Sequence, residues 1–298
     1  MADDSLSPRQ TPRFEPAHAG SGADSARTSD AGGGAPLPTA GFWDHLDELR
    51  RVLLRILGVT ALTSVAAFAC KRWLFAAVLA PARPDFVLWR LLARLSGGAD
   101  AGAQLLSEPM PQLISTQLTS QLLAHMTAAL YAGVLLASPY IVWQLFGFVS
   151  PALYERERRR SVAVLAASGL CFFAGTALAY WVIFPFSFRF LAAYQVSEQV
   201  VNTITLASYM DTLLVIALMM GVMFQLPVAA WFCARMGILT SRAMRARRRH
   251  ALFVIVALAA VITPTTDVFT LAVVSLPIMA LYQLSIAIVA RAERTAGH

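Results

Sequence analysis

Long apolar runs are the feature that most limits what this chain of 298 residues can fold into. They cover about residues 52–70, 122–146, 162–184, 209–232, 251–262 and 268–289. All but the fifth approach or exceed the ~20 residues with which a helix crosses a hydrocarbon core of ~30 Å. Apolar residues make up 57% of the chain and charged residues 14%, whereas a soluble domain carries about 25% charged residues. The sequence therefore predicts an all-α polytopic membrane protein with six transmembrane helices.

The fifth run is too short for an ordinary span. Its apolar part, residues 251–262, covers only ~18 Å at ~1.5 Å per residue. An arginine-rich stretch blocks its extension toward the N-terminus, and the sequence ITPTTD ends it on the other side. Such a helix thins the bilayer, lets its arginine side chains reach the interface, or lies sheltered by its neighbours.

Arginine residues gather in the connections that six spans place on one side of the membrane. They are Arg50, Arg51 and Arg55 at the first run; Arg156, Arg158, Arg159 and Arg160 after the second; Arg235, Arg242, Arg245, Arg247, Arg248 and Arg249 after the fourth; and Arg291 and Arg294 after the sixth. Because loops rich in Arg stay on the cytoplasmic side, both termini are expected to be cytoplasmic. The net charge of +7 follows from this arrangement, so nucleic-acid binding is not indicated.

Three regions are expected along the chain. Residues 1–41 are rich in Ala, Gly, Ser, Pro and Asp and cannot bury enough apolar surface to fold, so they should form a disordered cytoplasmic tail. Residues 42–290 should form the six-helix membrane domain, and residues 291–298 a short cytoplasmic tail. No apolar segment precedes the first run, so no cleaved signal peptide is expected. Prolines within the spans should kink their helices and give a concave bundle; these are Pro139, Pro227 and Pro277.

The first outer loop, residues 71–121, should have structure of its own. Its segment 85–95 (DFVLWRLLARL) places Arg90 and Arg94 on one face and apolar residues mostly elsewhere. This pattern predicts a helix that either lies on the membrane surface or caps the bundle. The three cysteines lie far apart, so neither a disulfide nor a metal site is expected, and no cofactor is indicated.

A charge cluster opens the first apolar run, in the sequence FWDHLDELRR from Phe42 to Arg51. Helix chemistry explains it locally. Asp44 can cap the start of the helix, and Asp47 stands four residues before Arg51, the favourable order for an ion pair. On these residues alone, the local explanation suffices.

Four polar motifs lie at the ends of the apolar runs or between them. HLDELRR opens the first, FVSPALYERERRR closes the second, FPFSFRFL follows the third, and ITPTTDVF joins the fifth to the sixth. With six spans and two cytoplasmic termini, this set resembles TatC, the multi-spanning receptor of the twin-arginine protein translocase, over residues 42–288. The resemblance implies a non-enzymatic receptor in the bacterial cytoplasmic membrane. It would bind twin-arginine signal peptides of folded precursors, use the proton-motive force, and have TatA- and TatB-type subunits, membrane lipids and further copies of itself as partners.

The resemblance places a signal-peptide site at the cytoplasmic face. Glu48 and Glu157 match the acids expected to receive the arginine pair, because a guanidinium is best recognised by a carboxylate. The other matching positions are Leu49, Arg50, Phe148, Pro151, Leu153 and Tyr154. Without the resemblance, Glu157 would be assigned to pairing with a neighbouring arginine in a solvated turn.

Further positions match family residues with partner-binding or structural roles. Pro81 lies in the first outer loop, and alternatively it only ends a surface segment. Asp267 lies at the last outer turn and can equally cap the sixth helix. Gln225 and Gln283 stand where the family commonly has glutamate, so no acid remains in the middle of a span. We expect partner subunits to bind through hydrogen bonds at Gln225 and Thr263.

Two other classes of membrane protein would show different sequence patterns. A secondary solute transporter would show inverted repeats or buried charge near the midplane. An intramembrane enzyme would show a GxS motif with a histidine, a pair of aspartates within the spans, or HExxH. The sequence contains none of these patterns. A transporter or a non-enzymatic membrane scaffold stays as the alternative.

Overall fold

The computed structural model describes residues 38–95, 113–149, 158–194, 203–263 and 267–296. Contacts divide the chain into two compact units, residues 1–43 and 44–298. Of the first unit, only residues 38–43 are described, as the opening of a helix. The helical bundle belongs to the second unit.

Seven helices make up most of the described chain. They are α1 (Pro38–Ala69), α5 (Ser120–Val149), α6 (Arg158–Leu178), α8 (Leu206–Met223), α9 (Leu226–Arg235), α11 (Arg248–Ile262) and α12 (Val268–Ala296). The shorter elements are α2 (Lys71–Val78), the 3-10 turn η1 (Ala80–Ala82), α3 (Val87–Leu95), the π-helical turn η2 (Ala179–Ile183), α7 (Phe184–Ala193) and α10 (Ser241–Ala246). Strands β1 (Leu113–Ile114) and β2 (Ile204–Thr205) pair in parallel.

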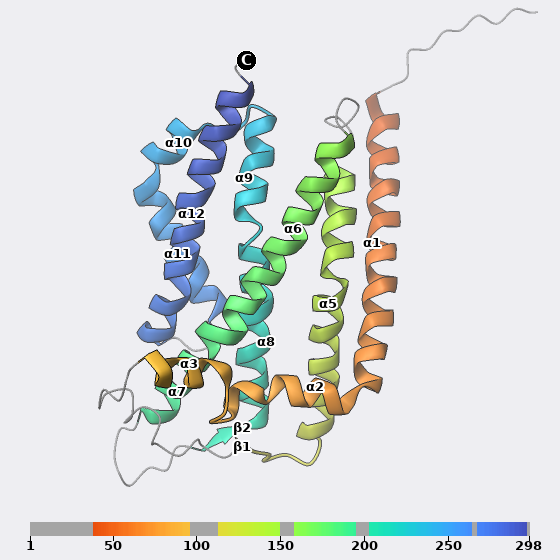
Figure 1. The fold of residues 1–298 in the computed structure, drawn as a ribbon. Helices are drawn as coiled ribbons and strands as arrows, with labels where there is room; N and C mark the ends of the chain where they lie inside the picture. The colour runs from red at the N-terminus through yellow and green to blue at the C-terminus, as the bar shows by residue number, and fades with distance from the viewer. Residues whose placement is uncertain (1–37, 96–112, 150–157, 195–202, 264–266, 297–298) are drawn as a thin grey trace, which may run out of the picture. The chain divides into compact units, whose positions relative to one another are not determined.

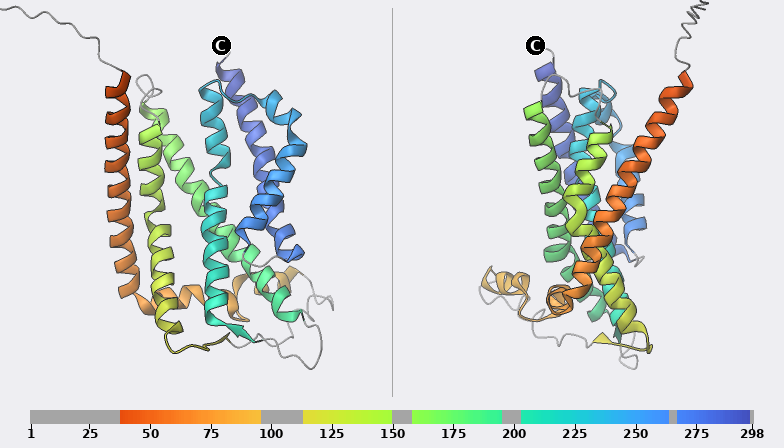
Figure 2. Two further views of the ribbon diagram at one scale, coloured as in Figure 1. Left: turned by 180° about the vertical axis from the view of Figure 1, so that it is seen from behind. Right: turned by 90° about the vertical axis from the view of Figure 1, so that its right-hand side faces the viewer.

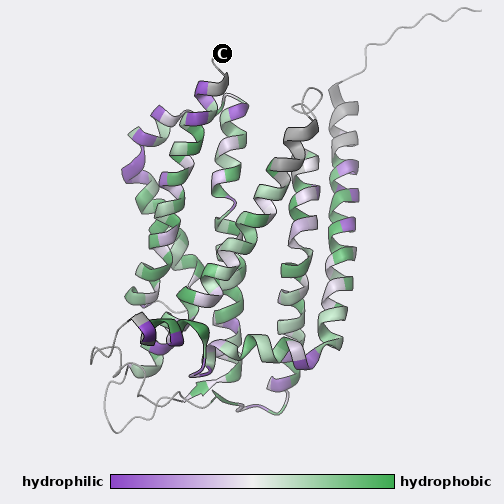
Figure 3. Ribbon diagram, viewed as in Figure 1, coloured by the Kyte–Doolittle hydropathy of each residue, from purple (hydrophilic) through white to green (hydrophobic). Residues whose placement is uncertain are grey.

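The helices of residues 44–298 run between two ends. Figure 1 shows α10 and the last turns of α9 and α12 at one end, and α2, α3 and the two strands at the other. The first of these is called here the predicted cytoplasmic end, and the second the predicted outer end. Figure 3 shows that apolar residues cover the helices between the ends, while the most hydrophilic residues gather toward the ends.

Among the described residues, five helical segments are long and apolar enough to cross a membrane. They are Leu46–Ala69, Ser120–Leu145, Ala166–Ala193, Leu206–Arg235 and Val268–Arg294. The remaining predicted span corresponds to α11, which has only 15 residues. The structure therefore confirms five runs of full length and a short one between the fourth and the sixth. The crossing of the membrane by α11, and the side on which the termini lie, stay predictions.

The first helix begins earlier than the sequence pattern suggested. Its first residue is Pro38, inside the stretch predicted as a tail, and Asp44 lies within the helix. The prediction that Asp44 caps this helix is therefore wrong. At the other end of the chain, α12 continues to Ala296, past residue 290. The rest of the predicted tail, residues 1–37, lies outside the described residues, so its disorder stays a prediction.

Residues 158–193 form one helical path through α6, η2 and α7. The third helix therefore continues past Phe184, where the third apolar run ends. In the π-helical turn, the N–H of Phe184 bonds to the carbonyl of Ala179, five residues back. Pro185 then lies in the first turn of α7, where its missing N–H is tolerated.

The fourth apolar run is divided into α8 and α9 at Phe224 and Gln225. Pro227 is the second residue of α9. Its ring clashes with the carbonyl four residues back, so it cannot continue the preceding helix. Where a kink was predicted at Pro227, the structure has a break between two helices. Pro139 and Pro277 lie inside α5 and α12, which both continue past them.

Helix α3 confirms the helix predicted within residues 85–95. The ring of Trp89 meets Phe186 of α7 edge-on, with 5.8 Å between the centroids. Phe86, just before α3, meets Tyr180 of η2 in the same manner at 5.7 Å. Both Trp89 and Phe86 are buried. These contacts favour a cap on the bundle over a helix that lies free on the membrane surface.

The core lies around α8. Met220 of α8 and Ile278 of α12 are completely buried in one apolar cluster. Nearer the predicted outer end, Phe184 packs edge-on against Tyr209, with 5.1 Å between the ring centroids. Helix α6 approaches α8 closely at Gly175, where an added Cβ would lie 2.5 Å from the carbonyl oxygen of Met220.

Helix α1 lies at one edge of the bundle, next to α5 (Figure 2). Its two sides differ. Val52 is buried, whereas Leu53 and Leu62 are exposed. The hydroxyl of Thr63 donates a hydrogen bond of 2.9 Å to the carbonyl of Gly133 in α5. In a membrane, the exposed leucines of α1 would face lipid or another protein.

Candidate functional site

The acidic residue predicted on the first helix lies near the predicted cytoplasmic end of α1. Glu48 and Arg50 are exposed, and Leu49 is 40% exposed. Because residues four apart lie on the same face of a helix, Glu48 stands one turn beyond Val52, which is buried. The carboxylate is thus accessible to a ligand on the side of α1 that faces the bundle.

The second half of the predicted site belongs to the connection between α5 and α6. Phe148 lies in the last turn of α5 and is half-buried. Pro151, Leu153, Tyr154 and Glu157 lie outside the described residues. The helices on either side of them, α5 and α6, are described. α5 ends and α6 begins at the same end of the bundle as the first turns of α1 that follow residue 43 (Figure 1).

Gln225 lies at the interruption between α8 and α9 and is half-buried. Its amide nitrogen donates a hydrogen bond of 3.0 Å to the backbone carbonyl of Ser168 in α6. Its amide oxygen accepts a hydrogen bond from the Ser168 hydroxyl, and Ser168 is fully buried. Both polar atoms of the Gln225 side chain are therefore used inside the chain, to join α6 to the α8–α9 interruption.

The remaining predicted positions lie toward the predicted outer end. Asp267 accepts a hydrogen bond of 2.6 Å from the N–H of Thr270 and so caps α12, which begins at Val268; this confirms the capping alternative. Thr263 directly follows α11 and is buried, and its hydroxyl donates a hydrogen bond to the carbonyl of Ala259 in that helix. Pro81 is fully buried in η1, so it serves at least a structural purpose there. Partner binding at these positions stays a prediction.

An apolar cavity opens between α6, α9 and α12, with a volume of about 360 Å³. Its lining residues are Val164, Ala167, Cys171, Pro227, Val228, Trp231, Leu284 and Ile288. The Arg235 guanidinium lies over the Trp231 ring at 5.5 Å and helps to hold it. The cavity suits an uncharged, apolar segment, and no motif in the sequence indicated it, because its walls come from three distant helices.

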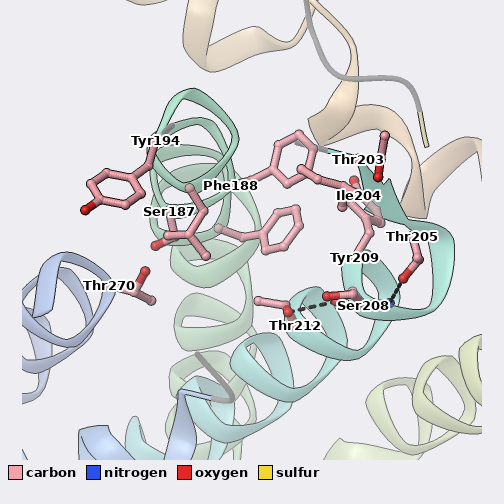
Figure 4. Close-up of a pocket in the computed structure, with 12 residues that line it drawn as sticks. Ser187, Phe188, Tyr194, Thr203, Ile204, Thr205, Ser208, Tyr209, Thr212 and Thr270 are labelled. Carbon is pink, nitrogen blue, oxygen red and sulfur yellow. Dashed lines mark hydrogen bonds between the residues drawn. The ribbon is translucent and has the colours of Figure 1, made fainter. Parts of the chain in front are cut away.

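A second cavity, of about 440 Å³, lies at the predicted outer end between α7, α8 and α12. Phe188 and Tyr209 form part of its wall. Figure 4 shows Ser187 and Thr270 on one side, with Thr203, Thr205 and Ser208 on the other. The hydroxyls of Ser187 and Thr270 are buried and have no hydrogen-bond partner among the described residues. Spaced hydroxyls on three segments escape any search for sequence motifs.

Metal chemistry finds no support in the part of the chain that the structure describes. There, no three His, Cys, Asp or Glu side chains gather in a group that could hold a metal ion. The three cysteines are free thiols.

A family model for the Sec-independent protein translocase protein TatC matches residues 44–277. The chain belongs to the TatC family. The TatC protein of Deinococcus radiodurans is 34% identical over 250 residues, which cover 84% of this chain and 86% of that protein. TatCy of Bacillus subtilis is 32% identical over 253 residues, which cover 85% of this chain and 90% of that protein.

Solved TatC structures have the same fold. A crystal structure of the twin arginine translocase receptor TatC matches this chain with a TM-score of 0.65 and 25% identity, covering 84% of this chain and 99% of that chain. The all-α membrane fold and the TatC resemblance are both confirmed. The TatC match extends over four of the five full-length spans and into α12, so this protein functions in Sec-independent protein transport.

Proposed function

We propose that this TatC-family protein is the receptor subunit that binds twin-arginine signal peptides of folded precursors at its cytoplasmic face. The observation that carries the proposal is the family match over most of the bundle, together with a solved relative described as a twin arginine translocase receptor. The proposal includes a topology with six spans and both termini in the cytoplasm of a bacterium. The arginine-rich connections support that orientation.

Glu48 and Glu157 are the proposed acceptors for the two guanidinium groups. A carboxylate can accept two parallel hydrogen bonds from one guanidinium, and the pairing strengthens where water is partly excluded. Glu48 is accessible on α1, and Glu157 directly precedes Arg158, the first residue of α6, in the sequence. Around them, Leu49, Arg50, Phe148, Pro151, Leu153 and Tyr154 complete the proposed contact surface.

The apolar cavity between α6, α9 and α12 is the proposed site for the next part of the signal peptide. Export signals carry an apolar segment of roughly 7–15 residues after their basic segment. Trp231 and Val164 supply an uncharged wall of matching character. A peptide whose arginines meet Glu157, just before α6, would have this wall within reach along the same helix.

Partner subunits complete the proposal. Single-span TatA- and TatB-type subunits, further copies of this chain and membrane lipids would assemble with it, and export would draw on the proton-motive force. Thr263 and Asp267 are proposed to lie at the partner contact near the outer turn. Gln225 is assigned first to its internal contact with Ser168, because that contact already uses both of its polar atoms.

Binding of a labelled twin-arginine peptide to the full-length protein in lipid nanodiscs tests the site. Because hydrogen bonds between charged groups contribute about 1.5–3 kcal/mol, Glu48→Ala and Glu157→Ala should each weaken binding about tenfold or more. The control is Asp85→Ala, which removes an exposed acid at the predicted outer end and should bind as the unaltered protein does. Equal binding by all three variants would show that the acids are not the acceptors.

A further inference from the structure

Six exposed basic residues gather where α10 meets α11. This group, called here the basic corner, consists of Arg242, Arg245, Arg247, Arg248, Arg249 and His250. No acidic residue occurs in the sequence between Asp211 and Asp267. The corner therefore has a strong positive charge that its own segment does not neutralise.

The basic corner is built on an anchored element. The carboxylate of Glu293 in α12 accepts hydrogen bonds from the Ser241 N–H at 2.7 Å and from the Ser241 hydroxyl at 2.5 Å. The Tyr282 hydroxyl donates a hydrogen bond of 2.8 Å to the backbone carbonyl of Met244. The Met244 side chain is buried against α9 and α12. These bonds fix α10 to the bundle, so the backbone that carries Arg242 and Arg245 needs little ordering when a ligand binds.

With α11 crossing the membrane as the sequence predicts, its length would place the corner at the depth of the lipid headgroups. Its 15 residues span only ~22 Å, less than a hydrocarbon core of ~30 Å. Phe253 is 77% exposed and Val261 82% exposed, so the outer face of α11 is apolar along its length and suited to lipid. A helix this short draws the basic residues at its start toward the bilayer surface, where their guanidinium groups meet phosphates.

We propose that the basic corner is a binding site for the phosphate of an anionic phospholipid in the cytoplasmic leaflet. Four to eight basic residues directly beside a membrane helix are typical of such sites. Guanidinium groups suit them because they bind phosphate oxygens through paired N–H donors. The bound lipid would hold the thinned bilayer against α11. An acidic protein partner would account for the charge but not for the shortness of α11, and the site is independent of signal-peptide binding.

Native mass spectrometry of the full-length protein, titrated with phosphatidylglycerol, tests the proposal. The variant carries Arg242→Gln, Arg248→Gln and Arg249→Gln and keeps Arg245, which interacts electrostatically with Glu293. The matched control carries Arg83→Gln, Arg90→Gln and Arg94→Gln, three exposed arginines at the predicted outer end. Phosphatidylcholine and glycerol 3-phosphate serve as comparison ligands.

The unaltered protein and the outer-end control should bind phosphatidylglycerol in preference to phosphatidylcholine. The corner variant should lose affinity for phosphatidylglycerol about tenfold or more. Equal loss in the control would overturn the proposal, as would equal binding of phosphatidylcholine. Full competition by glycerol 3-phosphate at the same concentration would also overturn it, since the site would then bind free phosphate. If the triple variant loses its helical circular dichroism signal, the single Gln variants at the same three positions replace it in the test. Each of them should weaken phosphatidylglycerol binding, whereas the single control variant Arg90→Gln should not.

Discussion

Gln225 and Ser168 form a two-way contact that joins the interruption between α8 and α9 to the middle of α6. The Gln225 amide nitrogen donates a hydrogen bond of 3.0 Å to the Ser168 backbone carbonyl, and the amide oxygen accepts a hydrogen bond from the Ser168 hydroxyl. By the family resemblance, Gln225 stands where a glutamate is common. An amide can both donate and accept hydrogen bonds, whereas an ionised carboxylate only accepts them. The contact therefore uses the one property that glutamate lacks.

Replacement of Gln225 by Leu should destabilise the protein by about 1–3 kcal/mol, because the buried Ser168 groups lose their partner. Adding Ser168→Ala to Gln225→Leu should restore part of the loss, since two apolar partners leave no unpaired hydroxyl. Unfolding in mixed micelles measures the four free energies of this double-mutant cycle. Gln283→Leu, at an exposed position of α12, is the control and should change little. Strict additivity of the two changes would contradict a direct contact.

Gly133 of α5 should not tolerate a side chain. A Cβ at this position would lie 2.0 Å from the Ser64 hydroxyl oxygen and 2.6 Å from the Ser64 backbone of α1. Gly133→Ala should therefore separate α1 from α5 and cost about 1–3 kcal/mol. Gly147→Ala on the same helix meets no atom within 4 Å, and it should be neutral or stabilise by up to ~1 kcal/mol. Similar melting temperatures for the two variants would show that α1 and α5 do not meet there.

Asp267 should act on stability through its cap of α12. Asp267→Ala removes the acceptor for the Thr270 N–H and should cost about 1 kcal/mol, whereas Asp267→Asn keeps an acceptor and should cost little. Thermal unfolding of the purified variants measures this difference. An equal loss of stability in both variants would mean that the charge, rather than the cap, is what the fold uses.

The apolar runs allowed most of the fold to be predicted. Burial in lipid depends on the length and character of a segment, so the five long spans and the short α11 could be read without knowledge of their neighbours. The third apolar run ends at Phe184, but the helix does not end with it. Here the π-helical turn η2 shifts the hydrogen bonds so that the chain stays helical to Ala193. Nothing in the local sequence marks that shift.

Elements that depend on distant partners could not be predicted. Helix α10 has six residues, and its anchors Tyr282 and Glu293 lie roughly 40 to 50 positions further along the chain. The pairing of Leu113 with Ile204 joins segments that no periodicity connects. For the candidate site, the motifs identified Glu48 on an accessible surface of α1. The hydrogen-bond partner of Gln225 could not be predicted from the sequence, because nothing distinguishes Ser168 there from other serines in helices.

Site-specific photo-crosslinking in membrane vesicles tests the receptor assignment most directly. A folded precursor with a twin-arginine signal, and its twin-lysine counterpart, would be presented to the unaltered protein and to its Glu48→Ala and Glu157→Ala variants. The receptor account predicts crosslinks to the connection between α5 and α6 that require both arginines of the signal and both acids of the protein. Crosslinks of equal yield with the twin-lysine precursor, or no crosslink in a protein that is folded and inserted, would contradict it.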